Sequence, residues 1–390
     1  MNVLFEHPFA VVGFILAILY AWSILGRRHE VAQAWGTKRI IRTFGPNALV
    51  VILVLAASAG LKQNLPRVDF GMFYSSALLL KQEPQHLYDP QRQTDYLHAV
   101  TGLAGEKHYL PFAYPPFVAF LFAPLTALSF RSAYFAMLGI NIALLVFMLW
   151  WLSSRLCHSR DQVAALVISA SAMLPLYGVL VLGHLSFVGV LLLSLFVTDM
   201  MSPRKWRVGL WTGLMLYKPI LFPVPLLMLL WKKQWRALAV FLGVAFGLLL
   251  FCFYLVGWDG LYANATMLLV MTNDYLLPRT QSLRGMVFAA GLGTSAWIVL
   301  VCITLLCLWI AVLRARDQRW VLGGAMIAVM LVPPYLQFHD LTIGLVGIAI
   351  ALSIMSTVSD RTRNCLFLIA LVPPALVLAG SRDHPIFPIM

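Results

Sequence analysis

The sequence predicts an all-α integral membrane protein that crosses the bilayer many times. Of its 390 residues, 61% are hydrophobic and only 11% are charged, whereas about 25% of residues are charged in soluble domains. Apolar stretches long enough to span a bilayer, each about 20 residues, recur through nearly the whole chain. We therefore expect a helical bundle of about 11–13 transmembrane segments.

Basic residues indicate which side of the membrane each loop faces. The formal net charge is +13, and the basic residues concentrate in short loops between apolar segments, as the positive-inside bias requires. The clusters are Arg27 to Arg42, Arg204 to Arg207, Lys232 to Arg236, Arg314 to Arg319, and Arg361 with Arg363. We place all of them in the cytoplasm, and the charge therefore gives no reason to expect a nucleic-acid partner.

The chain divides into an accessory amino-terminal part, residues 1–46, and a transmembrane domain, residues 47–390. The first apolar segment, Pro8 to Leu25, lacks a basic stretch before it and a small-residue cleavage site after it, so it is read as a retained anchor followed by a basic cytoplasmic loop. The domain opens with a span at Asn47 to Leu61. Residues 62–110 then form the longest polar stretch, which we place on the non-cytoplasmic side.

Two short helices are expected at the membrane surface within that outer loop. Apolar and polar side chains alternate in Phe70 to Leu80 and in His86 to Ala99, a pattern typical of interfacial helices. Tyr74, Tyr88 and Tyr114 are interpreted as belt aromatics at the membrane interface rather than as ligand contacts.

The later apolar segments include three that are unlike ordinary spans. Phe112 to Leu128 begins with two prolines and contains Pro124, so it is expected to be short or re-entrant. Val208 to Tyr217 and Ile220 to Trp231 are each too short to cross the bilayer. The remaining segments are Ala133 to Leu152, Val163 to Leu182, Leu185 to Met200, Ala237 to Val256, Thr294 to Leu313, Trp320 to Leu336, Leu341 to Thr357 and Cys365 to Leu378.

The polar side chains that could take part in catalysis or binding are predicted to lie on the non-cytoplasmic side of the membrane. Asp69 follows the span that ends near Leu61, and Lys218 stands between the two short segments at membrane depth, where a charge needs a partner or a function. The other candidates are His184, Arg284, His339 and Asp340. Each also has a structural interpretation: Asp69 could cap the helix that starts at Phe70, and Lys218 could extend toward the interface. Arg284 could anchor the next helix at the interface, and His184 could satisfy a helix break near Gly183. His339 and Asp340 could be a capping pair at the start of Leu341 to Thr357.

The sequence gives no sign of a metal or cofactor site. The five cysteines show no C-x-x-C spacing, so packing is their expected role. The cytoplasmic loops contain neither a glycine-rich phosphate loop nor a D-x-D pair, which argues against a nucleotide substrate.

Several short motifs occur in an order that resembles glycosyltransferase family 87. They are V-D-F-x-x-F-Y from Val68, L-Y-D-P from Leu87, Y-P-P from Tyr114, G-H-L-S from Gly183, Y-K-P from Tyr217, Q-S-L-R-G from Gln281 and P-P-Y-L-Q-F-H-D from Pro333. The resemblance extends over about Asn47 to Leu345. It departs at His184, where the family often has glutamine.

This resemblance implies a GT-C-type enzyme that uses a polyprenyl-phosphate sugar, typically mannose, and a lipid-linked or cell-envelope glycan as acceptor. It also implies a plasma membrane location, the inner membrane in bacteria, with the active site on the periplasmic or extracellular face. Asp69 would act as the general base of an inverting, metal-independent transfer, since a sugar hydroxyl needs a carboxylate to accept its proton. Lys218, Arg284 and His339 are the candidates to stabilise the phosphate leaving group, with Asp340 and His184 nearby.

Two other functions fit many spans and buried charges. A transporter or flippase for a lipid-linked glycan would show broken helices as well, although it would also predict an internal repeat, which is not evident in the sequence. A noncatalytic subunit of an envelope complex would tolerate the loss of Asp69.

Overall fold

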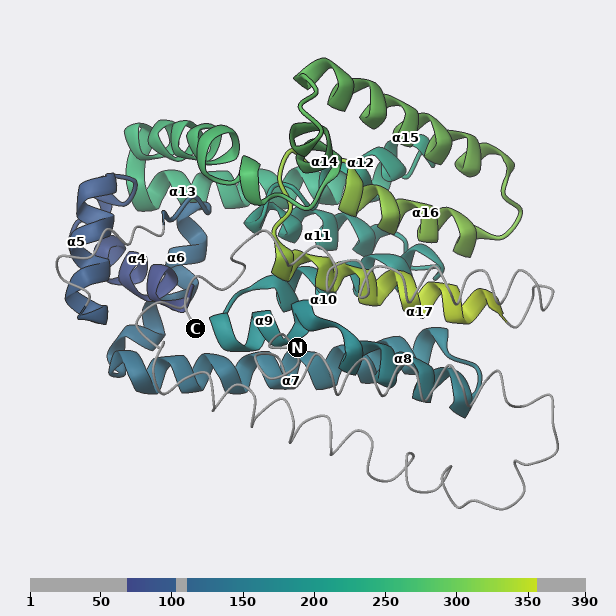
Figure 1. Cartoon of the computed structure of the whole chain (residues 1–390), viewed down its shortest axis with the longest axis horizontal. Coiled ribbons are helices and arrows are strands. Elements are labelled where there is room, and N and C mark those ends of the chain that lie inside the picture. Colours follow the sequence, from purple (N-terminus) through teal and green to yellow (C-terminus); the bar gives the residue numbers. More distant parts are fainter. Residues whose placement is uncertain (1–68, 103–110, 356–390) are drawn as a thin grey trace.

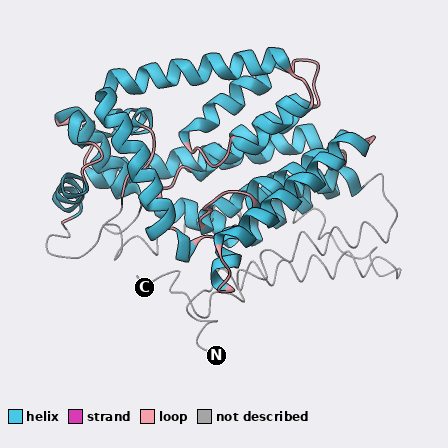
Figure 2. Ribbon diagram, turned by 90° about the horizontal axis from the view of Figure 1, so that it is seen from above, coloured by secondary structure: helices cyan, strands magenta, loops and turns pink. Residues whose placement is uncertain are grey.

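The described part of the chain is built from helices and loops, with no strand in it (Figure 2). A computed structural model describes residues 69–102 and 111–355. The predicted anchor in residues 1–46, the span Asn47 to Leu61 and the segment Cys365 to Leu378 lie outside these residues. The α-helices are α4 (Phe70–Gln82), α5 (Pro90–Thr101), α6 (Pro116–Phe122), α7 (Phe130–Leu156), α8 (Arg160–Ala172), α9 (Leu174–Leu182), α10 (Ser186–Met200), α11 (Trp206–Leu214), α12 (Pro223–Trp231), α13 (Trp235–Val270), α14 (Leu283–Ala289), α15 (Thr294–Arg314), α16 (Gln318–Leu331) and α17 (Gly344–Met355).

Long apolar helices show that this is a polytopic helical membrane protein. Within the described residues, α7, Trp235–Asn273 and α15 are long and apolar enough to cross a membrane, and a bent pair made by α8 and α9 brings the number to as many as 4. Shorter apolar helices, α10 and α16 among them, fill the bundle between them. The total of about 11–13 segments stays a prediction, since several expected spans fall outside the described residues.

Helix α7 illustrates how sequence periodicity positions these helices. Its buried residues recur at intervals of three and four, as in Tyr134, Leu138, Asn141, Leu145 and Met148, so they line one face that packs on the bundle. The opposite face exposes large apolar side chains such as Trp150, at 59% of its surface. An exposed face of this composition is suited to contact with lipid chains.

One predicted span is broken in the structure, whereas two predicted short segments are separate helices, as expected. Val163 to Leu182 is divided into α8 and α9, which bend by 60° at a break around Met173, and Pro175 lies in the first turn of α9. Proline has no backbone N–H to continue the preceding helix. The two short segments around Lys218 are indeed separate helices, α11 and α12, joined by a 3-10 turn at Met215–Tyr217 and an extended Lys218.

The two helices predicted within residues 62–110 are both present at one end of the bundle, where α4 packs against both α5 and α6 (Figure 1). The second, α5, begins at Pro90 rather than His86, because the side chain of Asp89 accepts hydrogen bonds from the first backbone N–H groups of the helix. The first, α4, is more deeply buried than a helix resting on a surface. Phe70 and Phe73 are fully buried, and Phe73 stacks on Phe122 of α6 at 4.8 Å.

The predicted short segment at Phe112 to Leu128 is short in the structure. Helix α6 has 7 residues and continues as a 3-10 turn, Ala123–Ala127, which begins one residue before Pro124. This helix also packs against α13, which the sequence predicted to end near Val256. Instead α13 continues to Val270 past Gly257, whose φ of 68° and ψ of −170° interrupt the helix.

Candidate active site

Asp69 directly precedes α4, but it does not act as a helix cap. Its backbone is already helical, and within the described residues its side chain makes no capping hydrogen bond. The alternative interpretation of Asp69 as an N-cap is therefore wrong. The residue is half-buried, and its carboxylate is available for other contacts.

The surroundings of Asp69 change its acidity. Burial raises the pKa of the Asp69 carboxyl to about 6, with the ammonium of Lys218 acting in the opposite direction and the carboxylate of Asp340 adding to the rise. A carboxyl with this pKa is still mostly ionised at neutral pH and is a stronger base than an exposed aspartate.

A close helix contact brings Asp69 to His184. Gly183 ends α9 in the left-handed conformation, with φ of 65°, which side chains with a Cβ adopt at a cost. A Cβ at this position would lie only 2.8 Å from the Cβ of Phe70. The residues next to these two, His184 and Asp69, are consequently neighbours although they are far apart in the sequence.

His184 is buried and held from several directions. Its Nδ1 lies 2.9 Å from the hydroxyl of Ser186, and its Nε2 lies 2.9 Å from the hydroxyl of Tyr114. Its backbone carbonyl accepts a hydrogen bond from Asn141 of α7 at 3.2 Å. The ring orientation is therefore fixed by Ser186 and Tyr114, and the backbone of His184 is held by Asn141.

His339 and Asp340 reach the same place from the turn that precedes α17. This 3-10 turn, Phe338–Ile343, starts with a capping box in which Asp340 accepts from the backbone of Gln337. The rings of His339 and His184 lie with their centroids 3.6 Å apart. The Nε2 of His339 is buried and has no hydrogen-bond partner among the described residues.

Lys218 forms a buried ion pair with Asp340. The distance from Nζ to Oδ1 is 2.6 Å, and the two side chains are only 4% and 2% exposed. The hydroxyl of Ser186 donates to the same carboxylate oxygen at 2.8 Å. The partner that a lysine at membrane depth requires is thus Asp340.

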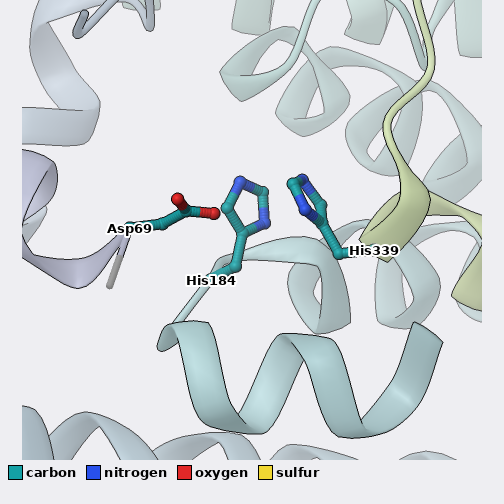
Figure 3. Close-up of side chains that lie close together, drawn as sticks. All are labelled: Asp69, His184 and His339. Carbon is teal, nitrogen blue, oxygen red and sulfur yellow. The ribbon is translucent and has the colours of Figure 1, made fainter. Parts of the chain in front are cut away.

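The structure brings together five of the six predicted site residues, of which Figure 3 shows Asp69, His184 and His339 pointing toward one another. One donor atom from each of these three lies within 4.8 Å of the others, so they could hold a metal ion. Arg284 is not joined to this group by any contact within the described residues. It binds the carbonyl of Thr272 and the side chain of Asn273, and it stacks over Trp297.

The three tyrosines interpreted as belt aromatics have other roles. Tyr74 and Tyr88 are buried and donate to the carbonyls of Leu128 and Tyr114, so that interpretation is wrong for them. It is wrong for Tyr114 too, whose hydroxyl contacts His184. The carbonyl of Tyr114 also accepts from Asn264 of α13 at 3.2 Å, so this residue connects the site to two further segments.

Sequence reasoning missed Ser186, Asn141 and Gly183. Ser186 and Gly183 are both part of the G-H-L-S motif, and the available signal was a serine two residues after a histidine within an apolar stretch. Asn141 gave a weaker one, as an amide inside the apolar segment Ala133 to Leu152.

Spanning helices, broken helices and a buried polar cluster define an enzyme-like site inside a helical membrane protein. The sequence model of glycosyltransferase family 87 matches residues 112–336, more than half of the chain. The chain therefore belongs to glycosyltransferase family 87, and it is a membrane glycosyltransferase. No curated protein and no solved structure matches it. The matched residues include His184, Lys218 and Arg284, whereas Asp69, His339 and Asp340 lie outside the match.

Proposed function

We propose that this glycosyltransferase moves a sugar, mannose in the first instance, from a polyprenyl-phosphate donor to a lipid-linked or cell-envelope glycan. The reaction takes place on the non-cytoplasmic side of the membrane, and Asp69 is the general base. The observation that carries the proposal is the position of Asp69. Its side chain makes no capping hydrogen bond to α4, and it lies beside two histidines and a buried ion pair.

The chemistry follows from these groups. Asp69 accepts the proton of the acceptor hydroxyl while the hydroxyl oxygen forms a bond to the anomeric carbon. The bond from that carbon to the phosphate oxygen breaks, and its electron pair leaves with the polyprenyl phosphate. Attack opposite the leaving group inverts the anomeric centre, through a transition state with oxocarbenium character.

The leaving phosphate is already anionic, so it needs donors rather than a protonating acid. An ammonium has three N–H groups, and Lys218 uses one of them on Asp340. The buried Nε2 of His339 is a second group in reach of the cluster. Arg284 remains a candidate only for contact with a part of the donor that lies away from this cluster, since its hydrogen bonds hold it on Thr272 and Asn273.

The test is a transfer assay with purified protein, a radiolabelled polyprenyl-phosphate mannose and a crude glycolipid acceptor, in the presence of a chelator. Asp69→Asn should lower the rate by at least about 100-fold, the contribution expected of a general base. Asp95→Asn is the matched control, because Asp95 is an exposed carboxylate on α5 that accepts a hydrogen bond from Gln91 and does not belong to the cluster of Asp69, His184 and His339. Asp95→Asn should keep the rate of the wild type.

Two results would contradict the proposal. If the Asp69→Asn variant still transfers the sugar at the wild-type rate, Asp69 is not the general base. Lipid translocation without any transfer, measured in proteoliposomes with the same lipid, would favour a transporter.

A further inference from the structure

We propose that Asp69, His184 and His339 form a binding site for a transition-metal ion of the Zn²⁺ class, and that the bound ion blocks sugar transfer. The binding site stands on geometry alone. Its inhibitory effect rests on the proposed function of Asp69 as the base.

The three donors come from separate elements that converge on one point. Asp69 precedes α4, His184 lies between α9 and α10, and His339 lies in the 3-10 turn before α17 (Figure 3). One donor atom of each lies within 4.8 Å of the others. Both imidazoles are at most 4% exposed, so water has little access to compete for them.

The hydrogen bonds of His184 determine which of its ring nitrogens carries the lone pair that a metal would bind. Asp340, ionised in its pair with Lys218, can only accept, so the single hydrogen of Ser186 is directed to it. Ser186 must then accept from Nδ1–H of His184, which places the lone pair on Nε2. In the structure the hydroxyl of Tyr114 donates to that lone pair at 2.9 Å, so a metal ion would take the place of this hydroxyl. Metal-binding histidines usually donate their second N–H to a carboxylate, carbonyl or water in this manner.

His339 supplies an independent sign of a ligand. Its Nε2 is buried without a hydrogen-bond partner in the described residues, and it lies 3.8 Å from Oδ1 of Asp340, beyond hydrogen-bond range. Buried polar atoms in folded proteins nearly always have a partner. A metal ion between the two histidines and Asp69 would provide one.

The donor set selects the kind of ion. Two imidazoles with one carboxylate suit Zn²⁺ and its transition-metal neighbours, whereas Mg²⁺ and Ca²⁺ prefer oxygen ligands. The local charge is favourable too, since two carboxylates, Asp69 and Asp340, face one ammonium, Lys218. Zinc bonds of about 2.1 Å require ligand atoms closer than 4.8 Å, and the half-buried Asp69 side chain, with no capping bond to hold it, can supply that movement.

Occupation of the site and catalysis exclude each other. A carboxylate that shares its electrons with Zn²⁺ is a much weaker proton acceptor, and the ion also fills the space between Asp69 and the histidines. Bound Zn²⁺ therefore removes the general base without any change in the fold.

The experiment measures binding and transfer separately, on full-length protein purified with a tag that contains no histidine. After chelation and removal of the chelator, Zn²⁺ is titrated by calorimetry and counted by elemental analysis, and Co²⁺ is used as an optical probe. One equivalent should bind. His339→Ala and His184→Ala should each weaken binding by at least about 100-fold, and Ser186→Ala by roughly 10–100-fold, as expected of a residue that orients a ligand.

Controls separate a lost ligand from a lost fold. His158→Ala removes an exposed histidine outside the cluster and should bind Zn²⁺ as the wild type does. His339→Gln replaces the alanine variant if that protein does not fold, as judged by thermal unfolding without metal. In the transfer assay, saturating Zn²⁺ should lower the wild-type rate by at least about 10-fold, with recovery on chelation.

The outcomes distinguish this inference from the proposed function. The site is overturned if wild type binds no stoichiometric Zn²⁺, or if His184→Ala/His339→Ala binds it equally well. Binding without inhibition overturns the blocking effect alone. An active Asp69→Asn variant would contradict the assignment of Asp69 as the general base. It would not affect the result of the Zn²⁺ binding measurement on the wild type.

Discussion

At the scale of single residues, the ion pair between Lys218 and Asp340 carries the largest predictable effect. Lys218→Met leaves the buried carboxylate without its partner, which should cost about 3–5 kcal/mol of stability. The double variant Lys218→Met/Asp340→Asn removes both charges and should regain part of that loss, yet it should stay inactive. Thermal unfolding in detergent and the transfer assay measure the two effects.

The control for this prediction is Arg92→Met. Arg92 pairs with Glu83 at the surface, with side chains 43% and 25% exposed, and such pairs contribute only about 0–1 kcal/mol. A loss of stability in Lys218→Met as small as in Arg92→Met would show that the buried pair is not structurally important.

The sequence predicted some of these residues for physical reasons and could not predict others. Asp69 and Lys218 stand out because a charge next to or within an apolar segment is costly and therefore conspicuous. The contact between His184 and His339 is invisible in the sequence, because it depends on a bend between α8 and α9 and on a helix contact at Gly183. For the same reason, a metal site could not be predicted from the sequence.

At the scale of elements, the end of α9 at Gly183 decides whether Asp69 and His184 meet. Gly183→Ala forces a Cβ into the left-handed conformation, at about 1–2 kcal/mol, and into the space occupied by Phe70. We expect lower thermal stability and a loss of transfer in the protein that does fold, since Phe70 and Asp69 must move away.

Gly102→Ala is the matched control for that change. Gly102 ends α5 with φ of 72°, and a Cβ there would meet no atom of the described residues within 4 Å. The Gly102→Ala substitution therefore costs only the free energy of placing a residue with a Cβ in the left-handed conformation, and it should leave the rate of transfer unchanged. Equal loss of transfer in both variants would show that the contact with Phe70 does not position the site.

Element boundaries also show where sequence periodicity is informative. The two short helices around Lys218 were predictable from their length and from flanking basic residues. The extension of α13 beyond Val256 was not, because Trp258, Asp259 and Asn264 interrupt the apolar run. Those residues remain within the helix, and Asn264 donates to the carbonyls of Ala113 and Tyr114, just before α6. Hydropathy encodes neither the backbone hydrogen bonds of the helix nor this contact.

At the scale of the whole molecule, the proposed orientation puts the outer-loop helices and the active site on one side and the basic loops on the other. In a variant without native cysteines, Gln91→Cys on α5 should react with a membrane-impermeant maleimide in intact cells. Arg204→Cys, between α10 and α11, should react only after permeabilisation. Both positions are exposed, so accessibility to the reagent depends on the side of the membrane.

The opposite labelling pattern would place the site on the cytoplasmic side and would contradict the orientation inferred from the basic clusters. Reaction of both cysteines in intact cells would contradict the sidedness of the loops altogether, provided that a cytoplasmic marker protein stays unlabelled.

The two hydrogen bonds accepted by the carbonyl of Tyr114 have a consequence for protein engineering. They join α13, through Asn264, and the outer-loop residue Tyr88 to the same residue whose hydroxyl contacts His184. Helix α13 exposes much of its surface, which makes it an inviting segment to exchange between family members. A chimaera that exchanges it must retain an amide at position 264, because the graft otherwise removes one of the supports that hold Tyr114 against the histidine.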